Sequence, residues 1–246
     1  MKYLREFTNH AAYEAFTGTS EFVLPNVSLC DQENELHFNP NSGPTPGGDY
    51  VEIGGVKWAT MNIGATSPSE VGLYFQWGDT SGYTASQVGT DKMFNWAIYK
   101  YCSGAGTSSS AMTKYNSTDG KTVLEASDDA AQANLGGGWR MPTTTEWQTL
   151  GNVVNANWTN DYEGSGVAGL VCTDKTDSSK VLFFPAAGYC MNGSIYLSTY
   201  AYLWSSTLYS ASQTNAYCAM FYGSTKTWNE YNTRMLGMPV RAVMDV

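Results

Sequence analysis

From Tyr50 to its end, the chain is divided into short strand-like segments by loops rich in Gly, Ser, Thr and Asn. Charged residues make up only 14% of the 246 residues, well below the usual quarter, whereas aromatic residues reach 14% and glycine occurs 25 times. The pattern predicts a loop-rich β protein and argues against a helix bundle or a disordered chain. The length predicts one or two domains. The strand-like segments are residues 50–58, 72–77, 94–101, 167–173, 181–190 and 238–244. Within the first of them, Gly54-Gly55 is the two-residue turn of a predicted tight hairpin.

Residues 1–40 are predicted to form a small module of a helix and a hairpin. Thr8 can cap a short helix at 9–16, and 21–30 and 35–38 are predicted strands joined by a polar turn. A unit of this size buries little apolar surface alone, so we expect it to attach the chain to the next domain or to a partner protein. Residues 41–49 contain two prolines, three glycines and no large apolar side chain, and are the predicted linker to a main domain at 50–246.

Two short helices are predicted in the main domain. The first spans 124–135, with Ser127 as its cap and Asp128 and Asp129 in its first turn. Adjacent carboxylates can hold a metal ion, but acids at a helix N-terminus also complement the helix dipole, and we favour that interpretation. A metal site is therefore not expected.

The second helix follows the strongest local signal in the chain, GGGWRMPTTTEWQTL at 136–150. Thr143 and Glu146 have the spacing of a capping box, and Trp147 and Leu150 are expected to share the buried face of the helix. The three glycines match no phosphate-binding motif. We expect them to allow the backbone to approach Trp139 closely.

The segment from Tyr196 to Arg241 contains seven of the 17 tyrosines, separated by small polar residues. Large rings mixed with small hydrogen-bonding side chains suit a recognition surface, so we predict that this segment binds another molecule. The alternative is that the rings are core residues or ordinary cross-strand pairs, which we favour for Trp204 and Phe221. A structural role is also favoured for Arg241, half-buried against a carboxylate or on a sheet edge. The predicted ligand-binding residues are Tyr209, Tyr217, Tyr222, Lys226, Trp228, Asn229, Glu230, Tyr231, Asn232 and Arg234.

Charge and cysteine content narrow the classes of partner. The net charge is -9 and the 13 basic residues form no run, which argues against nucleic acid and against an anionic membrane surface. No apolar run is long enough for a membrane span, and the first residues lack the features of a secretory signal. The five cysteines form no CxxC pair, so we predict free thiols, with Cys190 and Cys218 as the only candidate disulfide.

Several motifs of the main domain together resemble a known family. In order they are Trp58-Ala59-Thr60 with Asn62 and Gly64, Tyr74 to Gly78, Tyr99 to Cys102, GGGWRMPTTTEW, Phe184 to Tyr189, Trp204-Ser205-Ser206, and Val240-Arg241. Over residues 50–244 the chain resembles a group of gut Bacteroidales and phage proteins with a C-type lectin-like fold. The resemblance implies an α+β domain with two short helices, a twisted antiparallel sheet and long irregular loops.

Some members of this family are variable proteins of diversity-generating retroelements, in which adenine-directed mutagenesis diversifies codons of a C-terminal region. Residues 204–241 resemble such a region, with a framework of Trp204, Ser205, Ser206, Gly237, Val240 and Arg241. The resemblance implies a receptor-binding protein of a phage tail that recognises a host-surface protein or glycan. Residues 1–40 resemble the start of phage structural proteins, which implies contacts with other tail proteins. The alternative is an adhesin or pilus-tip protein of the bacterial surface with the same fold.

Calcium-dependent and enzymatic relatives of the fold are matched poorly. The calcium site of animal lectins uses E-P-N or Q-P-D with W-N-D, and the nearest segments here, 158–161 and 228–230, come without either triplet. Formylglycine-generating enzymes share a related fold and use cysteines, but the only histidines, His10 and His37, lie outside the main domain. A pair of carboxylates for glycoside hydrolysis remains an alternative. We expect neither catalysis nor a cofactor.

Overall fold

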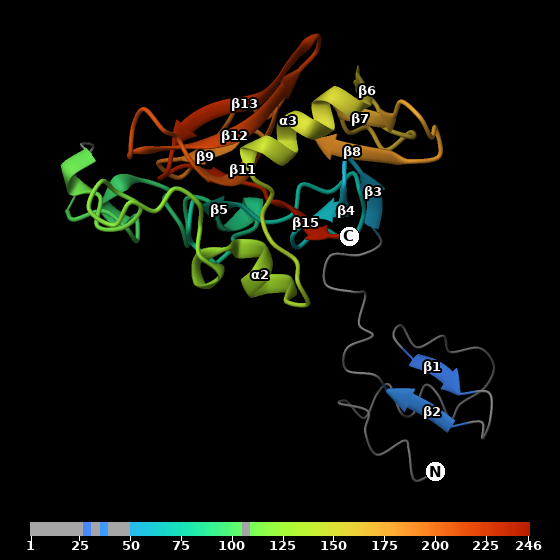
Figure 1. The fold of residues 1–246 in the computed structure, drawn as a ribbon, viewed down its shortest axis with the longest axis horizontal. Helices are drawn as coiled ribbons and strands as arrows, with labels where there is room; N and C mark the ends of the chain where they lie inside the picture. The colour runs from blue at the N-terminus through green and yellow to red at the C-terminus, as the bar shows by residue number, and fades with distance from the viewer. Residues whose placement is uncertain (1–26, 31–34, 39–49, 105–108) are drawn as a thin grey trace. The chain divides into compact units, whose positions relative to one another are not determined.

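The computed structural model describes residues 27–30, 35–38, 50–104 and 109–246 (Figure 1). The chain divides into two units, Met1–Pro46 and Gly47–Val246. In the first unit, strands β1 (Val27–Cys30) and β2 (Glu35–Phe38) pair antiparallel, with Val27 opposite Phe38. The helix expected at 9–16 and the linker expected at 41–49 lie outside the described residues.

The second unit begins with a hairpin that its last strand completes. Strands β3 (Tyr50–Ile53) and β4 (Val56–Asn62) turn at Gly54 and Gly55, whose φ angles of 66° and 86° are the left-handed values that glycine adopts without strain. The hairpin predicted at these two glycines is thus confirmed. Strand β15 (Arg241–Asp245) pairs with the other side of β4, so the two ends of the unit meet in one sheet.

Three further sheets make up the rest of the unit, and all the paired strands are antiparallel. Their strands are β5 (Phe75–Gln76), β6 (Val154–Thr159), β7 (Gly169–Asp174), β8 (Val181–Pro185), β9 (Tyr189–Met191), β10 (Ser194–Tyr196), β11 (Ala201–Leu208), β12 (Asn215–Tyr222), β13 (Thr225–Thr233) and β14 (Gly237–Met238). The sheet orders are β6-β7-β8, β10-β9-β14-β5 and β11-β12-β13. The prediction of a mainly antiparallel α+β unit with few helices is therefore confirmed.

Two predicted strands are shorter or absent. Of the segment 72–77 only β5 is a strand, and the segment 94–101 contains a 3-10 turn, η3 (Trp96–Ile98). Phe94 has a φ of 50°, a left-handed conformation that interrupts an extended segment. The Phe94 side chain is fully buried edge-on to Tyr83, and this tertiary contact holds the backbone where local pattern predicted a strand.

Both predicted helices exist, with one corrected boundary. Helix α2 (Ala130–Leu135) is capped by Asp129, whose carboxylate accepts the N–H groups of Ala131 and Gln132. The prediction that the helix starts near 124 with Ser127 as its cap is wrong, because Ser127 lies in the 3-10 turn η5 (Ala126–Asp128). The remaining 3-10 turns are η2 (Ala85–Gln87) and η4 (Ser109–Ala111).

Helix α3 (Thr144–Val153) has the predicted capping box. Thr143 accepts the N–H of Glu146 at 3.2 Å, and the Glu146 carboxylate accepts the N–H of Thr143 at 2.7 Å. Trp147 and Leu150 are buried as predicted. None of the helices in the described part of the chain has the length and apolar character that crossing a membrane requires.

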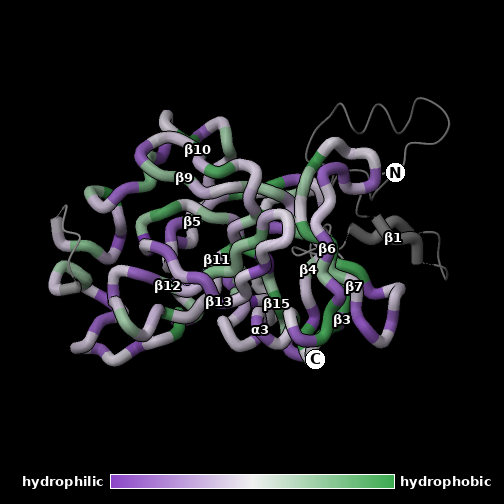
Figure 2. Tube along the Cα trace, turned by 90° about the horizontal axis from the view of Figure 1, so that it is seen from above, coloured by the Kyte–Doolittle hydropathy of each residue, from purple (hydrophilic) through white to green (hydrophobic). Residues whose placement is uncertain are grey.

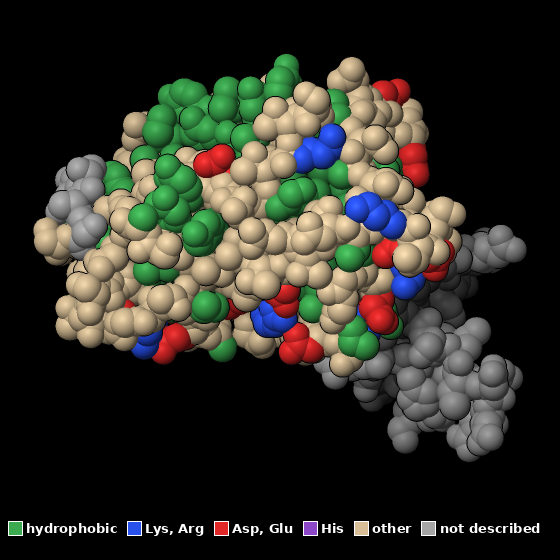
Figure 3. Space-filling view, turned by 45° about the horizontal axis from the view of Figure 1, so that its top comes forward, with side chains coloured by type: hydrophobic (Ala, Val, Ile, Leu, Met, Phe, Trp, Pro, Cys, Tyr) green, Lys and Arg blue, Asp and Glu red, His purple; other side chains and the backbone are tan. Residues whose placement is uncertain are grey.

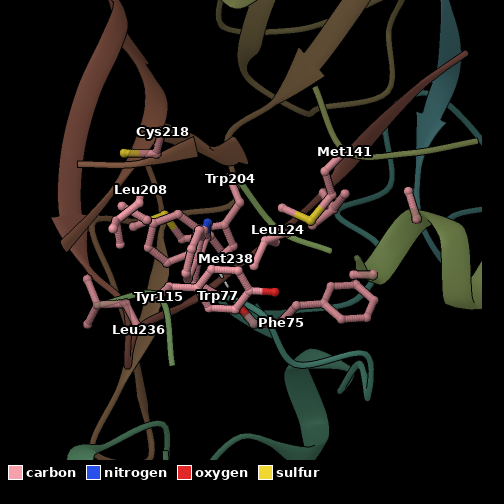
Figure 4. Close-up of a cluster of buried hydrophobic side chains, with 14 of the residues drawn as sticks. Phe75, Trp77, Tyr115, Leu124, Met141, Trp204, Leu208, Cys218, Leu236 and Met238 are labelled. Carbon is pink, nitrogen blue, oxygen red and sulfur yellow. Dashed lines mark hydrogen bonds between the residues drawn. The ribbon is translucent and has the colours of Figure 1, made fainter. Parts of the chain in front are cut away.

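The β11-β12-β13 sheet is the centre of the unit, because hydrophobic clusters cover both of its faces. Toward α3, Leu203, Ala219 and Phe221 join the cluster around Trp147. On the other face, Trp204 and Cys218 point into the cluster around Trp77 and Tyr115 (Figure 4). Helix α3 lies along the sheet in Figure 1. Figure 2 shows that the hydrophobic stretches are short and separated by polar ones, as expected for strands.

Arg241 holds strands from different sheets together. Its guanidinium is fully buried and donates to the Asn62 side chain, to the carbonyls of Ala59 and Thr60, and to the carbonyl of Phe183. Burial lowers its pKa to about 9. The predicted structural role fits this position. Of the two expected settings, half-burial against a carboxylate is wrong, since the partners are carbonyls and an amide, whereas a place on a sheet edge is confirmed, since β15 is an edge strand of the β15-β4-β3 sheet.

Candidate binding surface

The β12–β13 hairpin carries most of the predicted ligand contacts, and a bulge sets which of them face outward. Cys218 pairs with Glu230 and Met220 pairs with Thr227, so Trp228 and Asn229 together oppose the single residue between them. The extra residue changes the side-chain alternation along β13. Trp228 consequently faces α3, Asn229 is exposed, and Glu230 lies on the opposite face of the sheet.

Three predicted tyrosines, Tyr209, Tyr217 and Tyr231, meet in one group that we call the tyrosine cluster. Tyr217 and Tyr231 are cross-strand partners. The rings of Tyr209 and Tyr231 stack at 3.9 Å, and Tyr209 meets Tyr217 edge-on at 5.3 Å. Tyr231 remains 44% exposed. Burial and the neighbouring tyrosines raise the pKa of Tyr209, so its hydroxyl stays protonated and can donate or accept a hydrogen bond.

Four polar residues of β13 accompany the tyrosine cluster along the strand, and two of them, Glu230 and Asn232, lie on the opposite face of the sheet from Tyr231. Asn229 is exposed in the bulge, and Lys226 is half-buried opposite Phe221. The Glu230 carboxylate accepts the N–H of Tyr231, and the Asn232 amide reaches the Cys218 sulfur at 4.0 Å. β13 pairs only with β12 among the described strands, so its outer edge borders no other strand there. The tyrosine cluster and this edge therefore present partly exposed rings, side-chain amides and one charge of each sign.

Trp228 is placed mainly against the protein itself. Its ring centroid lies 4.6 Å from Phe221 and 6.4 Å from Trp147. A Cβ atom on Gly151 of α3 would come within 2.6 Å of the indole, so the helix needs glycine there. Trp228 is half-buried and joins the cluster beneath α3. Only the exposed part of its ring is left for the predicted contact with a ligand.

The prediction that Arg234 contacts a ligand is wrong. The side chain is fully buried, with Nε 2.8 Å from the hydroxyl of Tyr99 and with the other nitrogens on the carbonyls of Lys114, Tyr115 and Gln213. Its guanidinium also lies over the ring of Trp77 at 4.7 Å. The residue follows β13 directly, where the chain leaves the surface and enters the core, and a local pattern of polar residues gave no sign of that turn.

A second group of rings was missed in the sequence. Tyr222 is a predicted contact, but it stacks on Tyr200 at 4.3 Å and begins a continuous series of ring contacts. We call this series the aromatic ladder. Its members are Trp158, Tyr222, Tyr200, Tyr202, Tyr189 and Tyr196. The two-residue spacing of Tyr200 and Tyr202, which puts both rings on one face of a strand, was the available signal.

Figure 3 shows a broad gathering of hydrophobic side chains, tyrosine among them, over the region where β9, β12 and β13 lie. Few charged side chains interrupt it in that view. The largest exposed rings of the β9–β13 region are Tyr196, Tyr222 and Tyr231. An exposed patch of this kind on a folded unit is typical of an interaction surface.

Cys172, Cys190 and Cys218 have the chemistry of buried core residues. Cys190 and Cys218 are both free and lie in different hydrophobic clusters, so the candidate disulfide between them is not formed. Burial raises the pKa of Cys190 to about 12 and raises that of Cys172 and Cys218 as well, which keeps the reactive thiolate scarce. Within the described residues no group of His, Cys, Asp and Glu side chains is arranged to hold a metal ion.

Asp128, half of the acidic pair singled out in the sequence, lies in an ion-pair network. Lys100 and Lys114 both contact its carboxylate, and the Tyr115 hydroxyl donates to it at 2.6 Å. Burial alone would raise the pKa of Asp128, but these hydrogen bonds hold it well below its usual range. Burial raises the pKa of Asp129, against three backbone N–H groups that lower it. Both acids are thus occupied by structural contacts.

Comparison of the chain with protein-family models, with curated proteins and with solved structures gave no match.

Proposed function

We propose that the chain is a ligand-binding protein whose main domain has a C-type lectin-like fold and whose recognition surface is the tyrosine cluster with the edge of β13. The observation that carries this proposal is the stack of Tyr209 on the half-exposed Tyr231, next to the exposed Asn229. Rings held rigidly by one another lose little entropy on binding, and adjacent amides supply directional hydrogen bonds. The role is recognition without catalysis.

The resemblance to the C-type lectin-like family adds a biological setting, the phage tail, and a mechanism by which the binding surface varies in sequence. Two short α-helices among antiparallel sheets are what the resemblance implies, and the ordered motifs run through the same unit. We propose that residues 204–241 contain a diversified surface, that the protein belongs to a phage tail, and that the partner is a protein or glycan of the host cell. Residues 1–40 would attach it to other tail proteins.

Cell binding tests the proposed recognition role. The purified full chain is incubated with a panel of gut Bacteroidales strains, with and without EDTA, alongside Tyr209→Ala, Tyr231→Ala and the control Tyr50→Ala. Tyr50 is 52% exposed on β3 and belongs to neither ring group. Strain-selective binding that survives EDTA and is weakened only by the first two variants supports the proposal. Binding abolished by EDTA would replace it with a metal-dependent site, and no binding to any strain would contradict it.

Gene sequences from independent isolates test the diversification. The proposal expects adenine-directed changes at the codons of exposed residues such as Asn229 and Tyr231. The codons of Trp204 and Arg234 should stay constant, because both side chains are fully buried. Variation spread evenly over buried and exposed codons would be incompatible with a diversified surface.

A further inference from the structure

The aromatic ladder joins rings from five strands and one loop into a continuous series outside the tyrosine cluster. Tyr196 of β10 and Tyr189 of β9 are cross-strand partners whose rings are near-parallel at 5.8 Å. Tyr189 meets Tyr202 of β11 edge-on at 5.5 Å. Tyr202 continues to Tyr200 at 6.1 Å and to Tyr222 beyond it, and the Trp158 ring lies 6.0 Å from Tyr222.

Two rings of the ladder are exposed, Tyr196 at one end and Tyr222 next to the half-buried Trp158 at the other end. Tyr196 is 39% exposed and Tyr222 is 44% exposed, whereas Tyr202 is buried. Two other rings of the ladder, Tyr189 and Tyr200, pack against the cluster that contains Trp204, together with Met191 and Met220. The exposed rings are therefore backed by core and held by their neighbours, so that a ligand would meet a surface already in place.

The segment that supplies most of the ladder carries no charged residue, although the chain as a whole has a net charge of -9. No Asp, Glu, Lys, Arg or His occurs from Val181 to Thr225, a segment that supplies five of the six rings. Of the exposed residues close to the rings along the chain, five carry hydroxyls: Ser194, Ser198, Thr199, Ser224 and Thr225. Two others are the amide Asn192 and the apolar Leu197. One acid from outside this segment lies close to the ladder. Burial, Cys218 and Tyr189 raise the pKa of Tyr202 most, and Glu230 adds to that shift.

We propose that the aromatic ladder binds an uncharged glycan, with sugar rings lying on Tyr196 and Tyr222 and with neighbouring hydroxyl groups as hydrogen-bond partners. This inference rests on the proposed recognition function and names the ligand class for a surface beside the predicted one. The C–H face of a pyranose is apolar and weakly positive, which complements the negative face of an aromatic ring. Its hydroxyls pair with the Ser and Thr side chains that flank the rings.

Charge decides between this ligand and its competitors. A sialylated or sulfated glycan brings anions, and the segment from Val181 to Thr225 offers no cation to pair with them. Lys226, the next residue, is half-buried opposite Phe221, whose side chain belongs to the cluster on the α3 side. Desolvation of an anionic sugar on the exposed rings would therefore be poorly compensated. A protein partner usually surrounds its contact with a polar rim that includes charged groups. A neutral sugar chain needs only rings and hydroxyls, which is what the ladder provides.

Fractionated host polysaccharide tests the inference on the full chain. Surface polysaccharide is purified from a strain that the protein binds, freed of protein by protease, and separated by anion exchange into neutral and acidic fractions. We expect the neutral fraction to compete for cell binding and to bind the protein directly in calorimetry. We expect the affinity to be the same in 0.1 M and 1 M NaCl, because no ion pair contributes.

The variants Tyr196→Ala and Tyr222→Ala localise the site. Each removes an exposed ring at or next to one end of the ladder, and we expect each to weaken binding of the neutral fraction about tenfold, the size of a lost aromatic stacking contact. Tyr50→Ala is the matched control and should bind as the unmodified protein does. Far-UV and near-UV circular dichroism check that each variant keeps the fold.

The outcomes separate this inference from the proposed function. Cell binding that is lost in Tyr231→Ala, unaffected by the neutral fraction and unchanged in Tyr196→Ala and Tyr222→Ala would overturn the glycan site and leave the recognition function standing. Competition by the acidic fraction alone, or loss of binding when the cells are treated with protease, would also overturn it. If no strain is bound, the neutral oligosaccharides cellohexaose, maltohexaose and mannohexaose are titrated directly, and absence of binding to all three would reject the inference together with the function.

Discussion

Strands β11 and β13 belong to the same sheet, and each contains a Trp, a Tyr and at least one Thr, yet one is buried and the other is not. In β11 (AYLWSSTL) all residues except Thr207 are buried, and in β13 (TKTWNEYNT) none is. β11 is covered on both faces, and its N–H groups also reach Pro239 and Pro142 from other segments. β13 pairs with β12 alone among the described strands. Position in the sheet, more than residue type, separates core from surface here.

The largest expected effect is on the β11 side. Trp204→Ala should lower the free energy of unfolding by about 4 kcal/mol, since it removes a fully buried indole and leaves the Phe75 carbonyl without its donor. Urea denaturation followed by circular dichroism measures the loss. A loss under about 1 kcal/mol would mean that β11 is no more part of the core than β13 and would break the comparison.

Arg234 marks where the exposed strand ends. Arg234→Ala should cost about 3 kcal/mol in stability, because three carbonyls and the Tyr99 hydroxyl lose a buried partner. Arg234→Lys should recover only part of it, because a single ammonium cannot reproduce the planar set of donors. Urea denaturation of both variants gives the values. A stable Arg234→Ala protein with weakened ligand binding would return the residue to the recognition surface.

Alkaline pH provides a smaller test of burial in β11. Burial, then Cys218, Tyr189, Glu230 and Tyr200, raises the pKa of Tyr202 to about 12, above the value near 10 of an unfolded tyrosine. The contribution of Tyr202 to stability is complete below pH 10 and is lost as pH rises toward 12, since the unfolded chain releases the proton first. Tyr202→Phe should therefore make the unfolding free energy, measured by urea titration, less dependent on pH in this window. An unchanged dependence would show that the hydroxyl is not desolvated in the fold.

The smallest effect on stability is expected on the β13 side. Tyr231→Ala removes a half-exposed ring and should change the unfolding free energy by less than about 1 kcal/mol. Binding to the recognised cells should nevertheless fall. Thermal unfolding and cell binding of the same preparation measure both quantities. A large loss of stability would mean that Tyr231, like Trp204, contributes to the core, and would contradict the distinction between the two strands.

The elements that sequence reasoning predicted correctly depend on close neighbours in the chain. The turn at Gly54 and Gly55 needs two residues free to adopt positive φ, and the capping box needs Thr143 and Glu146 three apart. The predictions that failed depended on distant segments. Phe94 adopts a left-handed conformation in which its buried ring packs edge-on to Tyr83, and the helix expected from 124 starts only after Asp129, which accepts its first free N–H groups.

The candidate surface divides in the same way. Aromatic and small polar residues from Tyr196 to Arg241 predicted a recognition segment. In the structure the rings of Tyr209, Tyr217 and Tyr231 are in contact. That Arg234 is buried, that Trp228 packs on Gly151, and that Tyr189 and Trp158 extend the rings of Tyr222 into a ladder could not be foreseen. Each of these facts requires a segment far away in the chain.

The residues alone predicted a loop-rich β chain with two short helices, one of them with a capping box, and an aromatic C-terminal segment. Those properties follow from backbone preferences and spacing, which act over a few residues. Which rings of that segment face solvent was decided only when α3, β9 and the loop around Tyr115 covered the β11-β12-β13 sheet. Burial depends on what packs from elsewhere, and a linear pattern does not carry that information.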